Sequence, residues 1–125
     1  MRTVPAATTV AAFREAFPLG SPAHVIAVDS QGRYTGMVAA ADAHAAEASP
    51  QQSITAFLRS RDDVLLPGMA IKEAVLAFDR AEAEALAVVD SYHDRRVIGL
   101  LTEAYALRRY AAELERRRNE LVGDG

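Results

Sequence analysis

The 125-residue sequence contains no cysteine and no tryptophan, and aromatic residues make up only 6% of it. The absence of cysteine excludes disulfides and thiolate metal sites. No stretch approaches the roughly 20 apolar residues that a membrane-spanning helix needs. The first ten residues also lack the apolar core of a signal peptide. We therefore expect a soluble cytoplasmic protein with one ordinary domain or two small lobes.

An excess of basic residues is also missing. Lysine and arginine total 14 against 17 acidic residues, which gives a formal net charge of −3 at pH 7. This balance argues against a nucleic-acid partner, because such domains usually carry a net basic patch. The basic run 116–118 is interleaved with glutamates, which favours a solvated helix face over a membrane-binding patch.

Sequence motifs for catalysis and for metal binding are absent as well. His24, His44 and His93 are scattered without the spacing of metal ligands. The sequence has neither a nucleophile elbow nor a glycine-rich phosphate loop. We therefore predict no metal site, no catalytic residues and no enzymatic activity.

What the sequence does contain is an internal repeat. "TVAAFREAF" aligns with "AIKEAVLAF", "HVIAVD" with "ALAVVD", and "GMVAAADA" with "GLLTEAYA". The three matches occur in the same order, which indicates a duplicated unit of roughly 60 residues.

Each unit predicts the order β-α-β-β-α. A short extended segment ("RTVP" or "DVLLP") precedes an amphipathic helix, a strand rich in valine and alanine, a polar turn, a second strand and a closing helix. A helix between two strands implies a right-handed crossover to a parallel neighbour, and the tight turn makes the third strand antiparallel. We expect a three-stranded sheet with helices on one face in each unit.

One unit of this size leaves much of its apolar sheet uncovered. The expected fold is therefore α/β (α+β), with two small sheets packed about a pseudo-twofold axis, helices outside and clefts at the seam. The predicted organisation is repeat 1 at 1–47, a linker with a helical turn at 48–61, repeat 2 with a long last helix at 62–121, and a tail at 122–125.

Local signals support these elements. Thr9 is a predicted N-cap, and Gly32 provides backbone freedom in the first polar turn. The last helix is expected from Thr102 to about Leu121, with an ion pair between Glu113 and Arg117 at i,i+4 spacing.

Together with the duplicated order, the closing segments "GMVAAAD" and "GLLTEAY" make this sequence resemble a CBS domain pair, or Bateman module, over nearly its whole length. The stretch "GLLTEAYALRRYAAELERRR" is similar to the C-terminal cytosolic CBS region of bacterial ClC-type chloride channels and transporters. The resemblance implies a homodimeric regulatory or scaffolding module attached to a membrane transport domain. It also implies AMP, ADP or ATP as a regulatory ligand in the cleft between repeats, with no required cofactor.

In nucleotide-binding CBS pairs the closing motif reads Gly-h-h-[Ser/Thr]-x-x-Asp, where h is hydrophobic. The carboxylate can accept hydrogen bonds from ribose hydroxyls, and the hydroxyl can help the helix N-terminus hold a phosphate. This chain splits the pair, with Ala39 and Asp42 in repeat 1 but Thr102 and Tyr105 in repeat 2.

The resemblance thus implies ribose contact by Asp42 and phosphate contact by Thr102. Tyr105 stands where the family's carboxylate belongs, and an aromatic ring there can stack on a base or fill the second cleft. Backbone atoms of 4–6 and 25–27 are expected to frame the base. The candidate ligand-binding residues are Val4, Pro5, Ala6, Val25, Ile26, Ala27, Asp42, Thr102 and Tyr105.

Each key residue also has a purely structural interpretation. Asp42 lies in the first turn of its helix, where the helix dipole stabilises an acid, and Thr102 is a good N-cap without any ligand. Tyr105 can be a packed aromatic residue. Two other functions therefore stay open: a ligand-free structural dimerisation module, favoured by the split motifs, and the regulatory part of a soluble nucleotide-metabolism enzyme.

Overall fold

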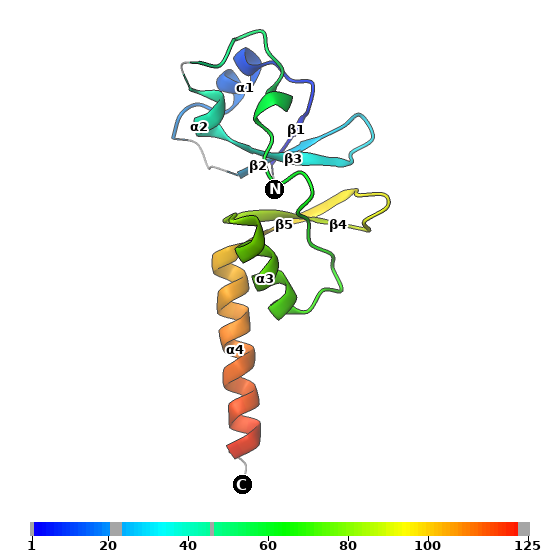
Figure 1. The fold of residues 1–125 in the computed structure, drawn as a ribbon, viewed down its shortest axis with the longest axis vertical. Coiled ribbons are helices and arrows are strands. Elements are labelled where there is room, and N and C mark those ends of the chain that lie inside the picture. The colour runs from blue at the N-terminus through cyan, green and yellow to red at the C-terminus, as the bar shows by residue number, and fades with distance from the viewer. Residues whose placement is uncertain (1, 21–23, 46, 123–125) are drawn as a thin grey trace.

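The computed structural model describes residues 2–20, 24–45 and 47–122, so 123–125 of the expected tail lie outside the described residues. The element order of repeat 1 is β-α-β-β-α, as predicted, whereas repeat 2 has the order α-β-β-α and lacks the expected first strand (Figure 1). The elements are β1 (Thr3–Pro5), α1 (Val10–Ala16), β2 (His24–Val28), β3 (Tyr34–Ala39), α2 (Ala40–Ala43), the 3-10 helix η1 (Ile54–Phe57), α3 (Ile71–Ala81), β4 (Ala85–Val89), β5 (Val97–Thr102) and α4 (Glu103–Val122).

The first sheet has the strand order β1-β2-β3. β1 runs parallel to β2, with Val4 opposite Ala27, and β2 is antiparallel to β3, with Ile26 opposite Met37. In the β2–β3 turn Gly32 adopts a φ of +77°, as expected for a glycine there. The three-stranded prediction is confirmed for this repeat.

The Asp29 side chain organises the same turn. Its Oδ1 atom accepts hydrogen bonds from the backbone N–H groups of Gln31 (2.8 Å) and Arg33 (2.9 Å). The hydrogen bond from the Arg33 amide, which favours the charged carboxylate, lowers the pKa of Asp29 below its ordinary value.

The second sheet differs from the prediction, because it contains only β4 and β5. The segment expected as its third strand forms a single parallel bridge, Leu65 to Val88. In repeat 1 the N–H of Ala6 donates to the Val28 carbonyl at 2.8 Å. The aligned residue in repeat 2 is Pro67, which has no N–H to donate, and the ladder stops there.

The two sheets face one another between two layers of helices (Figure 1). The seam core joins residues from both repeats and contains Ile26, Tyr34, Met37, Val64, Ala85, Ala87 and Val89. Two further clusters lie between each sheet and its own helices. The predicted face-to-face packing with helices outside is therefore confirmed.

The linker packs against the first repeat at two places. Its predicted helical turn is η1, where Ile54 is completely buried. Beyond η1, the backbone of Arg59 pairs with Met37 of β3, with N···O distances of 2.8 and 2.9 Å. This strand-like pairing was not predicted. It brings the Cβ atom of Leu58 within 2.9 Å of where a Cβ atom on Gly36 would lie.

The long last helix projects away from the two sheets (Figure 1). The Oγ1 atom of Thr102 caps it by accepting from the Tyr105 N–H at 3.2 Å. The predicted Glu113–Arg117 ion pair forms at 2.6 Å, and the predicted cap of α1 by Thr9 is also present. Within the described ranges, no helix combines the length and apolarity needed to cross a membrane.

Candidate functional site

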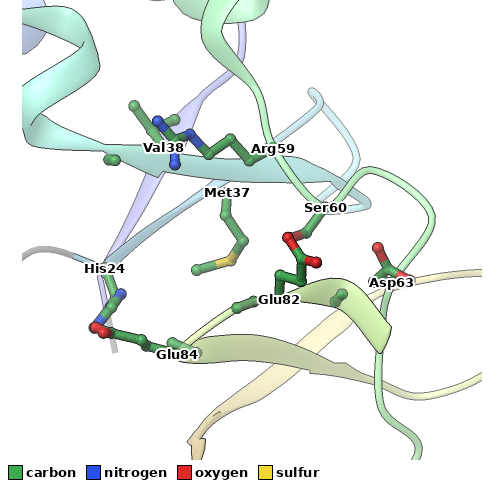
Figure 2. Close-up of a pocket in the computed structure, with 12 residues that line it drawn as sticks. His24, Met37, Val38, Arg59, Ser60, Asp63, Glu82 and Glu84 are labelled. Carbon is green, nitrogen blue, oxygen red and sulfur yellow. The ribbon is translucent and has the colours of Figure 1, made fainter. Parts of the chain in front are cut away.

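The seam contains a cavity of about 560 Å³ that both repeats line (Figure 2). One wall comes from β3 and from the linker segment around Arg59 that pairs with it. The other wall comes from the turn between α3 and β4. The lining residues are His24, Met37, Val38, Ala39, Arg59, Ser60, Asp63, Ala81, Glu82, Ala83, Glu84 and Ala85.

Two unusual backbone conformations shape the cavity wall. Ser60 has a φ of +54°, and Glu82, which ends α3, has a φ of +52°. The carbonyl of Ser60 is fixed by the Tyr34 hydroxyl, which donates to it at 2.5 Å. Burial of the Tyr34 ring disfavours its ionised form, so the pKa of Tyr34 is raised well above its ordinary value.

Asp42 lies beside the cavity and is not one of the residues that line it. Its carboxylate accepts two hydrogen bonds from Arg59, Nε to Oδ2 at 2.7 Å and Nη2 to Oδ1 at 2.6 Å. Asp42 is the third residue of α2, whose N-cap position, Ala39, provides no side-chain hydrogen bond. The carboxylate therefore fixes the guanidinium of a cavity-lining residue, a bidentate geometry that favours the pair.

The predicted framing residues do not reach this cavity. Val25, Ile26 and Ala27 are completely buried, and Val4 is 7% exposed, all within core clusters. The physical reason is that β2 is the central strand, hydrogen-bonded on both edges and covered on both faces. Pro5 and Ala6 belong to the β1 side of the sheet, where the Ser53 hydroxyl donates to the Ala6 carbonyl at 2.9 Å.

Thr102 and Tyr105 also lie apart from the cavity lining. Thr102 serves as the cap of α4. Tyr105 is 40% exposed, its hydroxyl accepts from Arg109 at 3.2 Å, and the guanidinium groups of Arg108 and Arg109 lie 5.9 and 6.0 Å from its ring centre. In this structure Tyr105 therefore contacts arginines of its own helix.

Sequence reasoning missed the residues that do line the cavity, above all Arg59, Met37, Glu82 and Glu84. Arg59 lies 17 residues from Asp42, in a segment without a recognisable motif. No motif in the sequence marks these residues, because they come together only through the packing of the two repeats.

No group of three or more potential metal-ligating side chains occurs in the part of the chain that the structure describes. A second cavity of about 490 Å³ is lined by 66–69, Glu73, Asp90 and Tyr92. All of these residues belong to repeat 2, so occupancy of this cavity would not bridge the repeats. The seam cavity, by contrast, is lined by residues of both repeats.

No family model and no curated protein matches this sequence. Solved structures do. A CBS domain pair/ACT domain protein from Thermotoga maritima is 20% identical, with a TM-score of 0.74 and coverage of 91% of both chains. The fold is that of a CBS domain pair. Sequence resemblance and three-dimensional structure agree on this point, although the identity is low.

Two other matching structures were solved with bound ligands. The cytosolic domain of the Mg²⁺ channel MgtE, in complex with ATP, is 19% identical with a TM-score of 0.70, covering 86% of this chain and 44% of that one. A CBS domain pair in complex with 5′-methylthioadenosine and S-adenosyl-L-methionine is 18% identical with a TM-score of 0.68, covering 90% of this chain and 89% of that one. Both of these matching structures therefore contain adenosine derivatives.

Proposed function

We propose that this CBS pair is a regulatory module of a membrane transport protein, of the chloride channel or transporter class, and that its seam cavity binds an adenine nucleotide or a related adenosine derivative. The observation that carries the proposal is the cavity itself, which residues of both repeats line. A ligand there contacts both halves, so its binding energy favours one relative arrangement of the repeats. The attached domain responds to that difference through linkage.

Two observations support the proposed class of ligand and the proposed class of attached protein. Neighbours with this fold were solved with ATP or with adenosine derivatives, and one of them is a domain of a Mg²⁺ channel. The choice of a chloride channel or transporter rests on the likeness of the β5–α4 sequence. In this proposal the module lies on the cytoplasmic side as a homodimer and has no catalytic role of its own.

Arg59 and Asp42 have complementary roles in the proposed site. Arg59 lines the cavity, and Asp42 beside the cavity holds the Arg59 guanidinium in place. Each Asp42 oxygen accepts one hydrogen bond from Arg59 and retains a second lone pair, so ribose contact stays compatible with the ion pair.

Calorimetry and thermal unfolding with AMP, ADP and ATP test the proposal. A ligand at 100 times its Kd should raise the free energy of unfolding by about 2.7 kcal/mol. We expect Arg59→Ala and Asp42→Ala to weaken binding, and Glu115→Ala, on the projecting part of α4, to leave it unchanged. The absence of any stabilisation at millimolar nucleotide would contradict the nucleotide proposal.

A structural dimerisation module is the second candidate. The specific observation in its favour is that α4 exposes Leu107 by 47%, Leu114 by 45% and Leu121 by 86%, at the seven-residue spacing of a helix–helix contact. Analytical ultracentrifugation of the chain and of a Leu107→Ala/Leu114→Ala variant tests it. A dimer that the variant disrupts, without any nucleotide effect on stability, would favour this candidate.

A further inference from the structure

The charges around the seam cavity are unbalanced. Three carboxylates line it, those of Asp63, Glu82 and Glu84, against the single guanidinium of Arg59. The Arg59 charge is already compensated by Asp42 outside the lining. The lining therefore contains more acidic than basic side chains.

The backbone adds to this excess. α3 ends at Ala81, which lines the cavity, so the carbonyl end of an eleven-residue helix lies at its wall. A helix C-terminus carries a partial negative charge, which disfavours anions and favours cations nearby. Arg80, the basic residue of that last turn, does not line the cavity.

The remaining wall is apolar and small. Four alanines leave room between the sheets, and the Met37 side chain points into the space between His24 and Glu84 on one side and Ser60 and Glu82 on the other (Figure 2). A thioether makes favourable contacts with aromatic rings. This combination suits a flat base with its sugar and leaves little positive charge for a chain of phosphates.

We propose that the cavity selects nucleosides that are uncharged or cationic over nucleoside polyphosphates. The inference rests on the proposed adenine ligand of the same cavity and specifies its charge. Like charges brought together repel one another, and such repulsion is a common source of selectivity. The single arginine, which is already paired with Asp42, offsets only part of the negative charge of three carboxylates and a helix C-terminus.

Isothermal titration calorimetry of the chain with adenosine, ATP and S-adenosyl-L-methionine in Mg²⁺-free buffer tests the proposal. We expect adenosine and the sulfonium compound to bind at least about tenfold more tightly than ATP, with a smaller ratio at high salt because of screening. The double variant Glu82→Gln/Glu84→Gln should gain affinity for ATP, lose affinity for the sulfonium compound and bind adenosine as before.

A matched control is Glu15→Gln/Glu47→Gln, which removes two exposed carboxylates that do not line the cavity and should change none of the three affinities. Tighter binding of ATP than of adenosine, or an unchanged ratio in Glu82→Gln/Glu84→Gln, would overturn the charge selectivity and leave the adenine site intact. Failure of all three compounds to bind at millimolar concentration would overturn the adenine site as well.

Discussion

Tyr34 connects the first sheet, the linker and the seam through one buried hydroxyl. Its side chain is 3% exposed, and it donates to the Ser60 carbonyl at the point where the linker turns into the cavity wall. The Arg95 guanidinium lies 5.4 Å from the centre of its ring, so the hairpin of the other repeat covers it. A single residue thus holds together parts of both repeats.

Replacement of Tyr34 by Phe should lower the free energy of unfolding by about 1–2 kcal/mol, because the Ser60 carbonyl loses its donor. The pKa of Tyr34 is raised by burial above its ordinary value of 10.0, so the neutral form is favoured in the folded state. Its contribution is therefore complete below about pH 10 and is lost as the pH rises further, while the unfolded chain ionises. Urea unfolding at pH 8 and above pH 10 measures both effects.

Tyr92→Phe is the control for this prediction, because Tyr92 is 62% exposed. We expect it to change neither the free energy of unfolding nor its decline at alkaline pH. If Tyr34→Phe shows the same alkaline decline as the parent chain, the buried hydroxyl does not control it.

Two aligned elements, β3 and β5, have different surroundings despite their similar sequences. The outer edge of β3 is paired with the linker at Arg59, and most of its residues are buried. β5 pairs with β4 only, among the described residues, and Ile98 is 53% exposed. The repeat explains the strands themselves, but the linker makes the two halves unequal.

Gly36 and Gly99 hold the same place in the two closing motifs and provide a matched test. A Cβ atom on Gly36 would meet the Leu58 Cβ atom at 2.9 Å, whereas on Gly99 the nearest atom is Val88 Cβ at 3.8 Å. Gly36→Val should therefore cost about 1–3 kcal/mol through overpacking. Gly99→Val should be neutral or stabilising, since valine favours strands. Thermal unfolding of both variants measures the difference, and equal losses would contradict the linker contact.

For the whole molecule, the seam core makes the two repeats one cooperative unit. Neither sheet covers its own inner face, and residues from both repeats interleave there. A regulatory role depends on this arrangement, because a ligand can shift the halves only if they share an interface whose geometry affects both.

Ile26→Ala removes a completely buried side chain from the seam and should cost about 2–5 kcal/mol. We expect both repeats to unfold together in one transition. Nuclear magnetic resonance signals from each repeat, recorded during urea titration, measure this. Leu121→Ala, at an 86% exposed position, should change the free energy of unfolding by no more than about 0.5 kcal/mol. Survival of repeat 2 after repeat 1 unfolds would contradict a shared core.

Periodicity and local chemistry made most of the fold predictable. The repeat, the hairpins, the cap at Thr9 and the Glu113–Arg117 pair depend on neighbours within a few residues, and the structure contains all of them. The prediction of a third strand in the second sheet was wrong for an equally local reason. Pro67 has no N–H to donate, which is visible in the sequence, but the alignment of the two repeats favoured a strand at this position.

The sequence by itself determined the helices and hairpins of the two repeats and their need for one another, because apolar periodicity decides which face of each element must leave water. Only the tertiary structure decided where the cavity lies and which residues line it. Arg59 meets Asp42, and Glu82 lines the same cavity as Met37 of the opposite sheet, through chain reversals that bring distant segments together. Such contacts depend on the packing of whole elements, for which a single sequence carries no local signal.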